Sequence, residues 1–74
     1  MEIYDSDKPV YAVVLAERLN LRELPTRSNE INVIHVLEEG DRVQVEEVSG
    51  EWAKVYMENG LQGYVMREFI YELL

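Results

Sequence analysis

RVQVEEVSGEWAKVYMENG, residues 42–60, consists of two runs in which apolar and polar side chains alternate. Strict alternation is typical of a β-strand with one face toward a core. The dipeptide Ser49-Gly50 separates the runs and Asn59-Gly60 follows them, and both dipeptides are typical of short β-hairpins. We therefore predict two consecutive hairpins, whose inward residues are Val43 and Val45, then Ala53, Val55 and Met57.

Further β-prone segments flank this stretch. Residues 11–16 (YAVVLA) are aliphatic and β-branched, and residues 19–22 (LNLR) alternate with Leu19 and Leu21 inward. VIHVL at 33–37 and GYV at 63–65 are two more short strands, and a brief turn at 66–68 precedes a last strand. Five to six short strands without a convincing helix predict an all-β fold, either a small barrel or a sandwich.

The two remaining segments are polar. Residues 1–9 carry three acidic residues and end at Pro9, so we predict a flexible N-terminal arm followed by one domain over residues 10–74. Residues 26–32 (TRSNEIN) are turn-prone and predict a surface loop. We expect Asn20 to hold this loop by a hydrogen bond to its backbone.

The composition excludes several kinds of site. The chain has 15 acidic and 7 basic residues, a net charge of -8, and such a field repels the phosphates of nucleic acids. The same field favours a basic partner. With no cysteine, the chain has no disulfide, no thiolate zinc site and no cysteine nucleophile.

The N-terminus, MEIYDSDKPV, lacks a positive segment followed by an apolar run, so we predict no signal peptide in this chain. No stretch approaches the roughly 18 consecutive apolar residues of a membrane span, so we predict no membrane insertion. Both a cytoplasmic protein and a module of a secreted or cell-surface protein fit these observations.

Segments in a fixed order carry a family resemblance: LNLRELPT (19–26), VIHVLEEGDRVQVEE (33–47), GEWAKVYM (50–57), GYV (63–65) and FIYEL (69–73). This order resembles the bacterial SH3 (SH3b) family over residues 11–73. The chain departs from the family pattern at Leu24, where a glycine often stands, at Glu51, and at Tyr64, which replaces a tryptophan. The resemblance implies a small SH3-like barrel of five to six antiparallel strands. It also implies a non-catalytic module that binds a peptide, a protein or the cell wall.

The resemblance places the long loop beside the recognition surface, with Arg22 and Glu23 at its start. Trp52 fits an exposed ligand platform, and equally a ring that packs on the core. A surface role also fits Tyr11 and Tyr64, whose hydroxyls could line a groove for a peptide. The predicted ligand-binding residues are therefore Tyr11, Arg22, Glu23, Trp52 and Tyr64.

The sequence contains no pattern of residues that is typical of a catalytic or metal-binding site. His35 is the sole histidine and has no partner at ligand spacing, while the acidic run at 38–47 is typical of a solvated face. We predict no enzyme activity, no cofactor and no metal. The first hypothesis is a module for a peptide or the peptide stem of peptidoglycan. The alternative is a standalone acidic interaction subunit of a phage or bacterium that docks a basic protein, as a monomer or a weak oligomer.

Overall fold

The computed structural model describes residues 2–3, 8–28 and 32–73, and its architecture is all-β, as predicted. A 3-10 turn, η2 (Arg67–Phe69), separates the last two strands. The strands are β1 (Glu2–Ile3), β2 (Val10–Val14), β3 (Arg18–Arg22), β4 (Val33–Glu38), β5 (Arg42–Ser49), β6 (Trp52–Tyr56), β7 (Gln62–Met66) and β8 (Ile70–Leu73).

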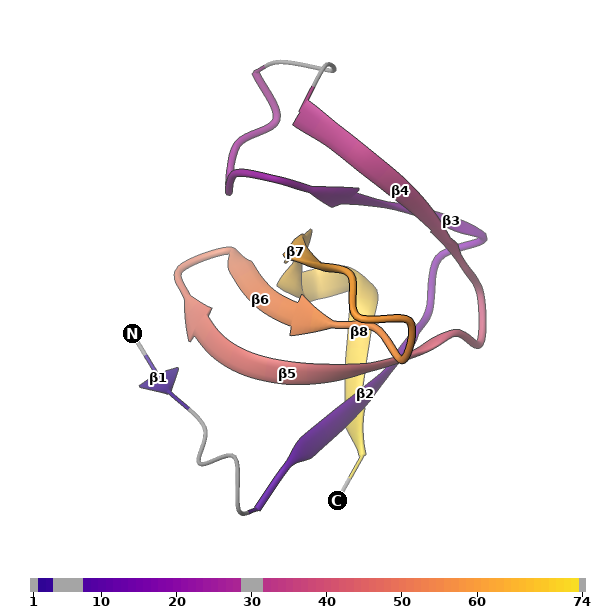
Figure 1. Cartoon of the computed structure of the whole chain (residues 1–74), viewed down its shortest axis with the longest axis vertical. Coiled ribbons are helices and arrows are strands. Elements are labelled where there is room, and N and C mark those ends of the chain that lie inside the picture. Colours follow the sequence, from indigo (N-terminus) through magenta and orange to yellow (C-terminus); the bar gives the residue numbers. More distant parts are fainter. Residues whose placement is uncertain (1, 4–7, 29–31, 74) are drawn as a thin grey trace.

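All strand pairings are antiparallel, in the order β4-β3-β7-β6-β5-β2-β8, with β1 paired to β5 (Figure 1). The consecutive neighbours β5, β6 and β7 form the two predicted hairpins, which are therefore confirmed. The strands at the two ends of this order, β4 and β8, do not pair with each other in the described residues. The sheet is therefore open.

The first hairpin turn lies one residue later than its dipeptide predicts. Ser49 pairs with Trp52, so the turn consists of Gly50 and Glu51. Gly50 has a φ of +60°, and glycine at the first of two turn positions is the pattern of a type II′ turn. This turn type matches the twist of the strands that it connects, which explains the shift.

The second turn contains Asn59 and Gly60, as predicted. The Met57 N–H donates to the Leu61 carbonyl at 2.8 Å, and the Gly60 N–H donates to the Met57 carbonyl at 3.0 Å. Gly60 has a φ of +90°, so it closes a three-residue loop in the left-handed conformation that glycine adopts without strain.

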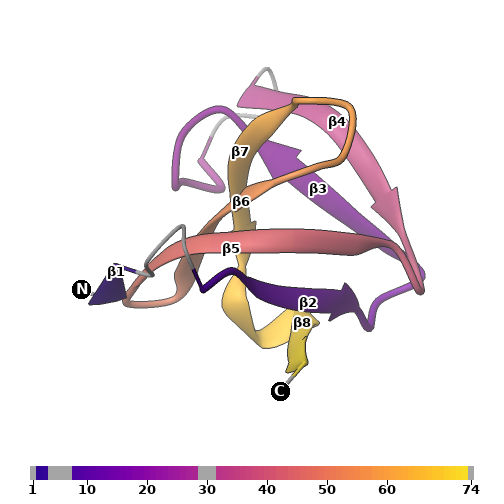
Figure 2. The ribbon, with the colours of Figure 1, turned by 60° about the horizontal axis from the view of Figure 1, so that its bottom comes forward.

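Two irregularities bend the sheet. On β5, Glu46 is an extra residue between the pairs Val45↔Val55 and Glu47↔Lys54. On β3 the register shifts between Leu21 and Arg22. Extra residues of this kind increase local bend and twist. The β3–β4 pair consequently lies across the molecule from β2 and β8, with β5 curving between them (Figure 1, Figure 2).

The sheet encloses an aliphatic core. The predicted inward residues are buried except Met57, which follows β6 and is half-buried against the core. Side chains from β2 to β7 make up the core: Ala12, Val14, Leu19, Leu21, Leu37, Val43, Val45, Val48, Ala53, Val55 and Val65.

The expected N-terminal arm begins with β1, in which Glu2 and Ile3 pair with Val48 and Glu47 of β5. Ile3 is nevertheless 72% exposed. Residues 4–7 of the expected arm lie outside the described residues, and the flexibility of the arm stays a prediction.

A single register pair, Arg22↔Tyr64, joins β3 to β7. Gly63 stands beside this pair at a close backbone approach. A Cβ atom on Gly63 would lie 2.6 Å from the Arg22 carbonyl oxygen and 3.0 Å from Leu21 Cγ. Glycine is therefore required here for reasons of space, because no real Cβ approaches a backbone atom so closely.

We expect Gly63→Ala to lower the free energy of unfolding by about 2 kcal/mol, because the added methyl group forces β3 and β7 apart. Ser49→Ala, at an exposed position of β5, is the control and should change it by less than about 0.5 kcal/mol. Urea denaturation of both variants measures the difference. Equal stability of Gly63→Ala and the native chain would contradict the close approach.

Candidate functional site

The outer face of the sheet carries a row of side chains that come from four strands. Arg22 of β3 pairs with Tyr64 of β7, Tyr64 pairs with Lys54 of β6, and Lys54 pairs with Glu47 of β5. Directly opposite residues of antiparallel strands point to the same face. The strand register thus collects two cations, an aromatic ring and a carboxylate along one line.

A second row of cross-strand pairs lies beside the first, because Trp52 pairs with both Met66 and Ser49. Trp52 and Tyr64 are each half-buried, and both line one hollow of about 230 Å³. We call this hollow the aromatic groove. Its lining residues are Pro25, Glu47, Ser49, Trp52, Lys54 and Tyr64.

The aromatic groove combines flat apolar walls with a few polar groups. Trp52, Tyr64 and Pro25 offer rigid surfaces against which an extended peptide can pack. Lys54 Nζ lies 3.8 Å from Glu46 Oε2, and Gln62 Nε2 donates to the same oxygen at 2.8 Å. Lys54 is therefore oriented at the edge of the groove while it still has protons to donate to a ligand carbonyl.

Asn32 fixes the loop that supplies Pro25. The Leu24 N–H donates to Asn32 Oδ1 at 2.7 Å, and Asn32 Nδ2 donates to the carbonyls of Leu24 at 2.9 Å and Thr26 at 3.0 Å. Asn32 is 7% exposed, so these bonds are largely shielded from water. Among the described residues every positive φ belongs to a glycine, so the backbone of Leu24 is not in the strained left-handed conformation.

The expectation for Asn20 was wrong. Asn20 is exposed on β3 opposite Val36. Its side chain forms no hydrogen bond with the described part of the chain, and Asn32 takes the role expected of it. The sequence contained a signal for this, because Asn32 is the polar residue of this loop that directly precedes a β run, where an amide can bond back across the loop.

A second hollow, of about 330 Å³, adjoins the row of side chains at Arg22. We call it the arginine pocket. Three cations of the outer face and its loop line it, next to apolar side chains from β7 and η2: Arg18, Arg22, Arg27, Met66 and Phe69. Asn20 is also among its lining residues. Arg22 is only 9% exposed, and its Nη1 atom has no hydrogen-bond partner among the described residues.

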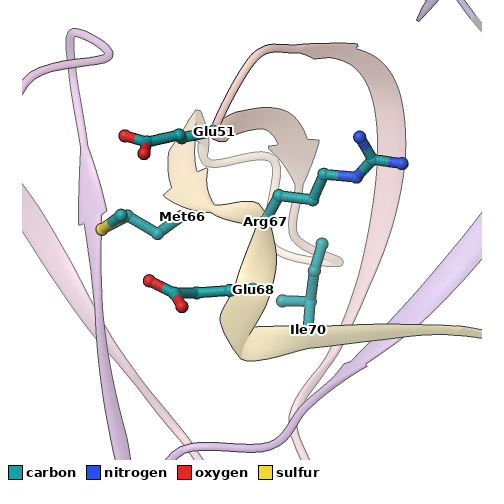
Figure 3. Close-up of a pocket in the computed structure, with 5 residues that line it drawn as sticks. All are labelled: Glu51, Met66, Arg67, Glu68 and Ile70. Carbon is teal, nitrogen blue, oxygen red and sulfur yellow. The ribbon is translucent and has the colours of Figure 1, made fainter.

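A third hollow, of about 390 Å³, lies beside η2 (Figure 3). Glu51 and Glu68 point to the same side as Met66, and Arg67 points to the other side (Figure 3). Two carboxylates without a third ligand are a poor cation site. In the part of the chain that the structure describes, no group of three or more His, Asp or Glu side chains is placed to hold a metal ion.

The five predicted ligand-binding residues are distributed over several places. Trp52 and Tyr64 meet in the aromatic groove, and Arg22 is the cross-strand neighbour of Tyr64 but lines the arginine pocket. Tyr11 lies on β2 in another hollow, together with Tyr56. Glu23 is exposed, and its N–H donates to the Asn32 carbonyl at 2.9 Å.

Comparison with known proteins adds no assignment: no protein-family model matches the chain, and no curated protein matches it. In the described residues, no helix has the length and apolarity needed to cross a membrane.

We expect Asn32→Ala to lower the free energy of unfolding by about 2 kcal/mol, because the side chain loses three hydrogen bonds that are shielded from water. Asn20→Ala is the matched control. It removes an exposed amide without such bonds and should cost less than about 0.5 kcal/mol. Chemical denaturation measures both values, and equal losses in the two variants would contradict the role of Asn32.

Proposed function

We propose that this chain is a non-catalytic binding module with a small SH3-like barrel, and that it recognises a peptide or the peptide stem of peptidoglycan. The barrel proposal is supported by the order of the motifs along the chain and by the bent antiparallel sheet. The ordered hairpins β5–β6 and β6–β7 are also consistent with it.

One observation carries the binding proposal: Trp52 and Tyr64, on different strands, line the same hollow as Pro25 of the long loop. Aromatic side chains of this kind dominate the energy of recognition surfaces. Extended peptides dock into aromatic-lined grooves by packing on such rings, and polar groups at the edge bond to their backbone. Lys54, Glu47 and Ser49 supply such polar groups here.

We expect Tyr64→Ala and Trp52→Ala each to weaken the binding of soluble peptidoglycan fragments by at least tenfold, as for a central interface residue. Tyr71→Ala is the control, because Tyr71 lies on β8 and is 61% exposed. Heteronuclear NMR titration measures the affinity and also reports whether each variant is folded.

The titration also identifies the surface. Shift changes should cluster on β6, β7 and the loop that contains Pro25. If the folded variants bind like the native chain, the groove is not the site. If the native chain shows no shifts at millimolar fragment concentration, the ligand is a different molecule and the peptidoglycan assignment fails.

The alternative function, docking of a basic protein, is favoured by acidic residues at one end of the molecule. The Glu39 N–H donates to the Glu17 carbonyl at 3.3 Å, which joins two turns. A third turn, at Glu58, lines one hollow with Asp41. We call this region the acidic end; its carboxylates are Glu17, Glu38, Glu39, Asp41 and Glu58.

For this alternative we expect a basic partner captured from a bacterial lysate to be released as salt rises from about 0.05 to 0.5 M, because exposed charges are screened within a few ångströms. A chain with Glu38→Gln, Glu39→Gln and Glu58→Gln should capture less of it at low salt. Retention of the partner at high salt, or by the triple variant, would contradict docking through the acidic end.

A further inference from the structure

The arginine pocket concentrates positive charge in a strongly acidic chain. Lysine and arginine number 7 against 15 acidic residues, yet Arg18, Arg22 and Arg27 line one hollow. No carboxylate is among the described residues that line it. Like charges that gather on one surface repel one another, so the arrangement is unfavourable unless an anion lies between them.

Among the described residues no ion pair joins these cations to a carboxylate, although Glu38 is the cross-strand neighbour of Arg18. The ion pair found there joins Lys54 to Glu46, outside the pocket. Arg22 is the most telling of the three, because it is nine-tenths buried and its Nη1 atom has no acceptor among the described residues. Burial of an unpaired guanidinium is costly, and native structures normally supply a partner for such a group.

The backbone explains why Arg22 is held in this position. Its strand neighbour is Tyr64, and its carbonyl oxygen abuts Gly63 at the junction of β3 and β7. These contacts fix the backbone of Arg22, and its side chain is only 9% exposed. Arg18 stands at the other end of β3 from Arg22 and is exposed, and Arg27 is exposed on the loop. Each can therefore adjust to a ligand at the opening of the pocket.

We propose that the arginine pocket binds a carboxylate that is carried on an apolar body. A guanidinium fork matches the two oxygens of a carboxylate, and Nη1 of Arg22 supplies an unused donor. Met66 and Phe69 form the apolar wall beside the cations. A free peptide C-terminus or a small organic acid has this chemistry.

The net charge of the chain favours a carboxylate over a phosphate. The long-range repulsion from a net charge of -8 acts on every negative charge of a ligand. A phosphate dianion meets about twice the repulsion that a singly charged carboxylate meets. The apolar wall adds nothing to the binding of inorganic phosphate. The proposal is independent of peptidoglycan recognition, because it uses neither Trp52 nor Tyr64.

The experiment compares N-acetyl-leucine with N-acetyl-leucinamide, which has the same apolar body and no charge. NMR titration of the full chain follows the Arg22 Nε–Hε group and the Met66 methyl group. We expect saturable shifts with the acid and at least tenfold weaker binding of the amide, since the bonds at stake are charge-assisted. Equal affinities, or no shift with the acid, would overturn the proposal.

Arg27→Gln tests the site, and Arg42→Gln is the matched control, because both residues are exposed and both variants change the net charge equally. Arg27→Gln should weaken binding of N-acetyl-leucine by about tenfold, while Arg42→Gln, outside the pocket, should leave it within about twofold. Equal losses in the two variants would show that only the overall field acts, and would overturn the site.

Arg22→Met separates binding from stability. Methionine keeps an unbranched apolar stem and removes the unpaired charge, so we expect unfolding to require the same or a higher urea concentration while binding is lost. If Arg22→Met does not fold, Arg22 has a structural role and the Arg27→Gln comparison decides the site. The native chain is also titrated with inorganic phosphate. If phosphate binds more tightly than N-acetyl-leucine, the carboxylate assignment is overturned.

Discussion

The structure depends on the close approach of β3 and β7 at Gly63. These strands share one register pair, and that pair attaches the β3–β4 hairpin to the remainder of the sheet. A side chain on Gly63 would meet the Arg22 carbonyl oxygen at 2.6 Å, so the attachment exists only because this position lacks a Cβ atom. The same contact sets Arg22 beside Tyr64, and thereby places the arginine pocket next to the aromatic groove on one outer face.

The two hollows differ in how their polar groups are satisfied. In the aromatic groove, Lys54 lies near Glu46, which also accepts a hydrogen bond from Gln62. In the arginine pocket, the buried Nη1 atom of Arg22 has no acceptor among the described residues. The first arrangement suits a neutral peptide that packs on rings, since its charge is already compensated. The second suits an anion, because the unused Nη1 donor of Arg22 can bond to it.

The alternating runs and glycine turns made the strand order of β5, β6 and β7 predictable, because both signals are local. The dipeptide misplaced the first turn by one residue, since the type II′ pattern needs Gly50 first. Trp52 and Tyr64 were also predictable as neighbours, through the family resemblance. The pairing of β3 with β7 was not, because nothing local to Arg22 indicates a partner that lies 42 residues later. The pocket that the three arginines share with Met66 of β7 depends on this long-range pairing.

A chain of 74 residues has a small core and a small free energy of unfolding. Each unfavourable group therefore lowers that free energy by a large fraction. An apolar residue at position 22 would fill the space between β3 and η2 without a desolvated charge. The retained guanidinium is therefore a poor choice for folding alone. Local rules of sequence and structure are broken most often where a ligand later satisfies the group concerned. The buried, unpaired arginine beside Met66 is such a broken rule, and it is the observation on which the proposal of a carboxylate site depends.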